Sequence, residues 1–147
     1  MARSIIAVIA SYVAMFVLAF IGFTCAYLIV GSDVAFKPGI YEASMSWIGI
    51  AFVINIVVAI IGGFICALIA KGGRASLALA ILAVVLGLVV AFADMNKGKK
   101  NAGMVRTANT PNMEAVQKAY WPIWVPFTFP LTSAIGILIG GKLKRRD

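Results

Sequence analysis

The sequence predicts an all-α integral membrane protein, an antiparallel four-helix bundle with a short interfacial helix before the fourth span. Of its 147 residues, 63% are hydrophobic and 12% are charged, whereas average soluble domains are ~45–50% apolar and ~25% charged. Four apolar runs approach the ~20 residues that a spanning helix needs. The period-two alternation of membrane strands does not occur in these runs. A bilayer would solvate apolar side chains that a soluble fold of this size could not cover.

The four apolar runs are expected to form a single membrane domain over residues 1–147. They cover residues 5–30, 46–70, 75–93 and 122–141. The first run is longer than the ~7–15 residues of a signal-peptide core, so we expect a retained helix. Asp94 ends the third run and Lys142 ends the fourth. Backbone polar groups find no partner in hydrocarbon, so each run is expected to be helical.

The first two connections contain turn residues. Lys37-Pro38-Gly39 predicts a turn after the first helix, because proline presets φ and glycine tolerates a positive φ. Only Lys71-Gly72-Gly73-Arg74 separates the second run from the third. So short a link predicts a hairpin of two neighbouring antiparallel helices.

The third connection, residues 94–121, divides into two parts. Residues 96–103 are rich in glycine and lysine and are predicted to be mobile. Thr110 is then expected to cap a short helix, with Pro111 at its first position and its end near Ala119. One face of this helix would lie on the membrane surface. That face would carry Met113, Val116 and Tyr120.

The net charge of +8 is placed where a membrane protein keeps its cations. Six basic residues at the ends of apolar runs are expected to contact lipid headgroups, and nucleic-acid binding is not expected. They are Lys71, Arg74, Lys142, Lys144, Arg145 and Arg146. By the positive-inside rule they favour cytoplasmic termini, although the lysines of residues 96–103 oppose that orientation.

Small residues recur every four positions in three of the predicted helices. They are Ala59, Gly63 and Ala67 in the second, Ala83, Gly87 and Ala91 in the third, and Gly136 and Gly140 in the fourth. Such spacing lets helix backbones approach closely in lipid. Packing within the chain is the simpler interpretation, and self-association into an oligomer is the alternative.

Asn55 is the only amide side chain in the core of a predicted span. It is expected to form a hydrogen bond to another helix, with contact to a transported solute as the alternative.

The entrance of the fourth helix is rich in proline and tryptophan. The residues concerned are Trp121, Pro122, Trp124, Pro126 and Pro130. Pro126 and Pro130 each remove a backbone donor, which predicts an irregular or kinked entrance. The tryptophans are typical of the aromatic belt at a membrane interface. Anchoring is the simpler interpretation, and a gate or a groove for a partner is the alternative.

No residue pattern indicates a catalytic, metal or cofactor site. The chain has no histidine, which excludes histidine-based metal ligation and catalysis. Cys25 and Cys66 are interpreted as small apolar packing residues, and whether they pair is left open. Glycine-rich phosphate loops and nucleophile elbows are absent from the sequence. We therefore expect a protein that is not an enzyme and needs no cofactor.

The segments 36–42, 112–117 and 122–124 resemble those of a family of small bacterial four-helix inner-membrane proteins with no assigned function. The resemblance covers the whole chain and implies a bacterial inner-membrane location, but no residue-level role. The four-helix arrangement is also similar to that of small multidrug transporters. Those carry a glutamate in the first membrane helix, and this chain has none there.

Two functional hypotheses follow from the sequence. The first is a scaffold or accessory subunit that acts through helix packing and contacts with lipids, other membrane subunits or a second copy. The second is a small transporter or channel for a neutral or apolar solute. Ion-coupled transport is not expected, because no acidic or basic side chain lies inside the predicted spans.

Overall fold

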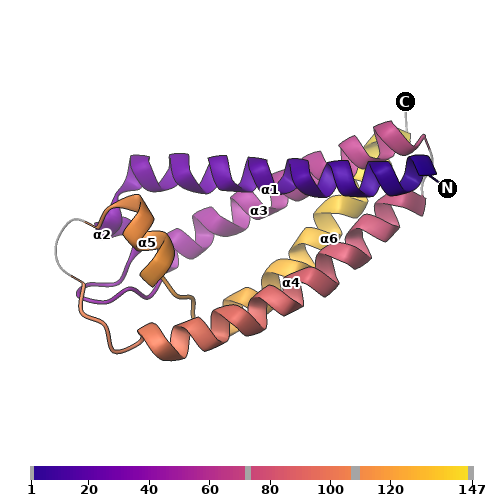
Figure 1. The fold of residues 1–147 in the computed structure, drawn as a ribbon. Coiled ribbons are helices and arrows are strands. Elements are labelled where there is room, and N and C mark those ends of the chain that lie inside the picture. The colour runs from indigo at the N-terminus through magenta and orange to yellow at the C-terminus, as the bar shows by residue number, and fades with distance from the viewer. Residues whose placement is uncertain (1, 72–73, 107–109, 146–147) are drawn as a thin grey trace.

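The computed structural model describes residues 2–71, 74–106 and 110–145, and its long helices form one elongated bundle (Figure 1). The helices are α1 (Ala2–Val30), α2 (Ser32–Ala35), α3 (Met45–Ala70), α4 (Arg74–Asn101), α5 (Asn112–Lys118) and α6 (Trp124–Arg145). Helices α1, α3, α4 and α6 are long and apolar enough to cross a membrane. The predicted all-α membrane bundle, with a short helix before the fourth span, is therefore confirmed.

Helix α3 is the centre of the bundle, because it packs against both α6 and α1. Helix α4 packs mainly on α6. Helices α1 and α4 run in the same direction and meet near the chain termini, where Ala7 of α1 shares a core with Leu79 of α4. They diverge toward the opposite end of the bundle (Figure 1). This divergence leaves one side of α1 without a helical neighbour.

The connections at the end opposite the termini fold into a compact unit, which we call the cap. It comprises residues 31–44, 102–106 and 110–123. Its extended segments form isolated bridges between Phe36 and Ala43, Ile40 and Val105, and Glu42 and Tyr120. The Ala43 amide donates to the Tyr120 carbonyl at 3.0 Å, and the Tyr120 amide donates to the Tyr41 carbonyl at 3.1 Å. The cap thus ties the first connection to the third.

The cap has its own hydrophobic core, separate from the core near the termini. Tyr27, Phe36, Tyr41 and Trp47 are buried in it, and Ala115 of α5 packs against them. The aromatic rings meet edge to face, with 6.0 Å between the Tyr27 and Trp47 ring centroids. This geometry suits the charge distribution of aromatic rings.

Helix α4 extends beyond Asp94, where the third apolar run ends, and it includes most of residues 96–103, which were predicted to form a mobile connection. Helix α4 continues to Asn101. The buried Asn101 amide donates to the carbonyl oxygens of Gln117 at 3.4 Å and Lys118 at 3.0 Å. Because α4 is bonded to the end of α5 in this way, the glycine and lysines of its last turns remain helical. Lys99 and Lys100 also lie in the last turn, where the helix dipole favours positive charge.

Helices α5 and α6 begin later than predicted. Pro111, not Thr110, occupies the N-cap position of α5, and no side chain caps that end. Helix α6 begins at Trp124 instead of residue 122. Pro126 therefore lies in the first turn, where a backbone donor has no helical partner in any case. Only Pro130 lies inside the helix, so it alone disrupts the backbone ladder.

Candidate functional site: a lateral groove beneath the cap

A groove of about 340 Å³ lies between α1, the end of α4 and the cap. Small-molecule sites are ~300–1,000 Å³ and mostly apolar. This groove matches both properties, because aromatic and aliphatic side chains form most of its wall. Residues of both α1 and α4 line it, and these two helices diverge toward the cap (Figure 1).

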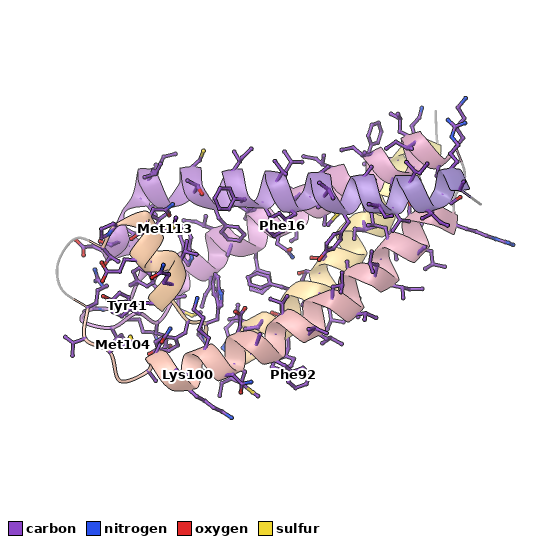
Figure 2. All side chains as sticks on the ribbon, viewed as in Figure 1. Phe16, Tyr41, Phe92, Lys100, Met104 and Met113 are labelled. Carbon is purple, nitrogen blue, oxygen red and sulfur yellow. The ribbon has the colours of Figure 1, made fainter. Side chains whose placement is uncertain are left out.

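One wall of the groove is a continuous stripe along α1. Its residues are Phe16, Ala19, Phe20, Phe23, Thr24 and Tyr27. Their spacing of three, four, seven and eight places them on one face of the helix. Phe16 lies midway along α1 (Figure 2) and has 70% of its surface exposed, whereas Tyr27 is buried at the cap. The stripe therefore runs from an open end to a covered end.

The facing wall combines polar groups of α4 with α5 and the entrance of α6. Asp94 and Lys97 line the groove from α4, and Val116 and Trp121 line it from the third connection. Lys97 Nζ donates to the Val116 carbonyl at 2.6 Å, which uses one of the three ammonium donors. The Asp94 carboxylate forms no ion pair with any residue that the structure describes.

The length of the groove can be compared with the thickness of a membrane. Asp94 lies about 30 Å along α4 from Arg74, at ~1.5 Å per residue, and a hydrocarbon core is ~30 Å thick. Arg74 and Asp94 therefore flank a stretch of α4 that is about one hydrocarbon thickness long. From Tyr27 to Phe16 the stripe on α1 measures about 16 Å. That is close to half the hydrocarbon thickness, or one leaflet.

The Glu114 carboxylate of α5 accepts two hydrogen bonds within the cap. Lys118 donates to Glu114 across one turn of α5 at 2.7 Å, and the Tyr41 hydroxyl donates to the same carboxylate at 3.1 Å. The hydrogen bonds from Lys118 and Tyr41 lower the pKa of Glu114, and the bond to Glu114 raises the pKa of Lys118. Burial, helped by the nearby Glu42 carboxylate, raises the pKa of Tyr120.

Arg106 anchors the third connection to the first. Its side chain is only 6% exposed and pairs with Asp33 at 3.1 Å. Its guanidinium carbon also lies 5.7 Å from the centroid of the Phe36 ring, a cation–π arrangement. The Arg106 amide donates to the Gly39 carbonyl at 2.8 Å. The turn predicted at Lys37-Pro38-Gly39 is present, and Gly39 adopts φ 73° there.

The predicted small residues lie mostly at helix contacts within the chain. A Cβ atom at Gly63 would overlap the Ile137 carbonyl, and one at Gly140 would overlap the Ile60 carbonyl. A Cβ at Gly136 would come within 2.7 Å of the Ala59 Cβ. These contacts join α3 to α6 through their backbones. Ala67, Ala83 and Ala91 are also buried.

Asn55 bridges α3 and α6 through three hydrogen bonds. Its amide nitrogen donates to Thr132 Oγ1 at 2.8 Å and to the Phe129 carbonyl at 3.3 Å. Its oxygen accepts from Ser133 Oγ at 2.8 Å. Asn55 does not line the groove. The structure thus places it in the interhelical role that the sequence favoured.

The residues predicted at the entrance of the fourth helix have separate environments. Trp121 lines the groove, whereas Trp124 is half-exposed and lies outside it. Pro126 and Pro130 are buried, and Pro122 is partly buried just before α6. Pro130 packs so closely on α4 that a Cβ at Gly87 would lie 2.6 Å from its Cγ. Just after Pro130, Thr132 Oγ1 donates to the Phe129 carbonyl at 3.0 Å.

The predicted headgroup cations gather at the end that holds the termini. Lys71, Arg74 and Lys142 are exposed and Lys144 is partly exposed there, while Arg146 and the side chain of Arg145 lie outside the described residues. Arg3 joins this end by donating to the Ile69 carbonyl at 2.6 Å. Cys25 and Cys66 are not paired with each other. Among the described residues, no group of three potential metal ligands occurs.

Most of the groove was missed at the level of sequence. The aromatic spacing of Phe16, Phe20, Phe23 and Tyr27 was a usable signal, because it puts four rings on one helix face. No signal linked this face to Asp94 and Lys97, which lie about seventy residues away in sequence. Their meeting depends on how α1 and α4 pack.

Comparison with known protein families, with curated proteins and with solved structures gave no match to this chain.

Proposed function

We propose that the protein is a non-enzymatic integral membrane accessory protein that holds an apolar chain from the bilayer in its lateral groove. One observation carries the proposal, namely an apolar hollow of about 340 Å³ at the place where α1 leaves α4. In a bilayer, lipid acyl chains would fill an apolar hollow that is open toward the membrane. The absence of histidine and the small number of acidic residues support a role without catalysis.

Binding of a lipid chain in the groove is better supported than self-association of the protein through its small-residue stripes. Gly63, Gly136 and Gly140 already receive the backbone of a neighbouring helix within the chain. They are therefore not free to receive a second copy. The groove, in contrast, is open toward the bilayer along α1.

Transport of a neutral or apolar solute is the second candidate. The groove favours it, because the same apolar wall would accept a small apolar solute. The Asn55 cluster does not support a polar path, since its three hydrogen bonds are internal. Uptake of an apolar dye into vesicles containing the protein distinguishes the candidates, because a binding protein would not accelerate that uptake.

We also propose a bacterial inner-membrane location with cytoplasmic termini. The exposed Lys71, Arg74 and Lys142 lie at one end of the bundle together with Arg3. A short hairpin and chain ends rich in lysine and arginine are typical of the cytoplasmic face. The lysines at the end of α4 lie at the other end, as the sequence anticipated.

Fluorescence quenching tests occupation of the groove. Trp47 lines the groove and has only 9% of its surface exposed. In a Trp121→Phe, Trp124→Phe variant in detergent, Trp47 is the only remaining tryptophan. Adding a few equivalents of phospholipid with brominated acyl chains should quench Trp47 in a saturable manner, because bromine quenches only on contact.

A groove-filling substitution provides the matched control. Ala19→Phe places a ring in the groove, whereas Ala10→Phe places one on an exposed position of the same helix. Quenching should disappear in the first variant and persist in the second. If Ala19→Phe does not fold, Thr24→Phe replaces it on the same wall. Equal saturable quenching in filled and unfilled proteins, or none in either, would contradict the proposal.

A further inference from the structure

We infer that the groove selects a phospholipid whose headgroup carries a primary ammonium group, as an ethanolamine headgroup does. The inference rests on the proposed function. It adds the identity of the headgroup, which would bind to Asp94 and to the neighbouring Lys97.

The dimensions of the groove fit one lipid tail of the leaflet on the cap side. The stripe on α1 covers about 16 Å, close to the half-thickness of a hydrocarbon core. It is lined by rings and small apolar groups from Phe16 up to Tyr27. The cap covers the end of the stripe at Tyr27, and α1 is exposed at the other end, at Phe16. A tail that enters from the bilayer would therefore lie along α1 with its headgroup near the cap.

Two opposite charges stand at headgroup depth on one face of α4. Asp94 and Lys97 are three residues apart, a spacing that puts them side by side on a helix. Both line the groove. Lys97 retains two donors after its bond to Val116, and these suit a phosphate oxygen. The Asp94 carboxylate forms no ion pair with a described residue, although the Lys97 charge lies near it, so its oxygens can accept hydrogen bonds from an ammonium group.

This pair of charges is expected to bind the common phospholipid headgroups with different affinities. An ethanolamine headgroup presents a phosphate and an ammonium that can donate hydrogen bonds to both Asp94 oxygens. A choline headgroup keeps the positive charge but donates no hydrogen bond. A glycerol headgroup brings a net negative charge close to Asp94, which is unfavourable. The expected order of retention is ethanolamine, then choline, then glycerol.

Native mass spectrometry of the purified full chain tests this order. The detergent-solubilised protein is mixed with equimolar phosphatidylethanolamine, phosphatidylcholine and phosphatidylglycerol that share the same acyl chains. Retention of the ethanolamine lipid should exceed that of the glycerol lipid by about fivefold or more, the size expected for a charge-assisted hydrogen bond. Asp94→Asn should reduce the preference to about twofold or less, because it removes the negative charge.

Glu42→Gln is the matched control. Glu42 pairs with Lys37 in the cap and does not line the groove, so this variant removes the same charge from the same end of the protein and should keep the preference. Circular dichroism checks that both variants are folded. A wild-type protein without preference, a preference for phosphatidylglycerol, or an unchanged preference in Asp94→Asn overturns the inference but leaves the proposed function standing. Equal lipid retention by wild type and Ala19→Phe overturns the proposed function itself.

Discussion

At the scale of single residues, the absence of a side chain decides how closely α3 and α6 pack. Gly63 and Gly140 each face a backbone carbonyl of the other helix, so a methyl group there has no room. In lipid, where water does not drive helices together, such backbone contact supplies the dispersion energy that holds them. The Asn55 bridge adds directional hydrogen bonds to the same pair of helices.

Gly140→Ala should destabilise the bundle by ~1–3 kcal/mol, because the methyl group meets the fixed Ile60 carbonyl and the helices must separate. The free energy of unfolding is measured by denaturant titration in mixed micelles with circular dichroism. Gly49→Ala is the control, because a Cβ atom there would have no neighbouring atom within 4 Å and alanine favours a helix. A Gly140→Ala protein as stable as Gly49→Ala would show that the contact is not tight.

At the scale of elements, contacts decide the lengths of α4 and α5 more than local propensity does. Residues 96–101 are helical although they contain Gly98 and three lysines, because Lys97 and Asn101 bond to carbonyls of α5. Helix α5 has only seven residues, too few to be stable alone. It is held by Ala115 in the cap core and by the Glu114 carboxylate, which accepts from Tyr41.

Glu114 should titrate below the ordinary glutamate pKa of ~4.3, because hydrogen bonds from Lys118 and Tyr41 stabilise its charged form. The folded pKa is depressed, so this attachment of α5 is fully present above the unfolded pKa. It is lost as the pH falls through the folded pKa. Carboxyl-carbon NMR of the protein in micelles measures the titration midpoint.

Lys118→Met is the comparison for this titration, because it removes the hydrogen bond that contributes most to the lowered pKa. The Glu114 midpoint should rise in this variant. Identical midpoints in the wild type and in Lys118→Met would mean that the ion pair does not form in the micelle-bound protein.

At the scale of the whole molecule, the two ends of the bundle differ. The end with the termini carries exposed cations around a core of small residues, and the other end carries the cap with its aromatic core. The groove exists because the cap and the divergence of α1 from α4 occur at the same end (Figure 1). The asymmetry therefore locates the candidate site in one leaflet.

If the termini are cytoplasmic, a fluorescent protein fused to the C-terminus should be bright in a bacterial host, and alkaline phosphatase fused there should be inactive. The physical reason is the attraction of the terminal cations to the cytoplasmic side. Replacing Lys142 and Lys144 with glutamine should weaken this bias, whereas replacing Lys99 and Lys100 should strengthen it. An active phosphatase fusion in the wild type would reverse the proposed orientation and move the groove to the cytoplasmic leaflet.

The sequence by itself determined the fold class, the four apolar spans and the positions of the small residues. Each of these follows from local composition, because the bilayer allows few forms for an apolar run and small side chains allow close packing. Only the tertiary structure decided the length of α4, the existence of the cap and the groove. These depend on how distant segments are placed, such as Asn101 beside Lys118 and Asp94 across the groove from the face of α1 that begins at Phe16, and no local pattern encodes such placements.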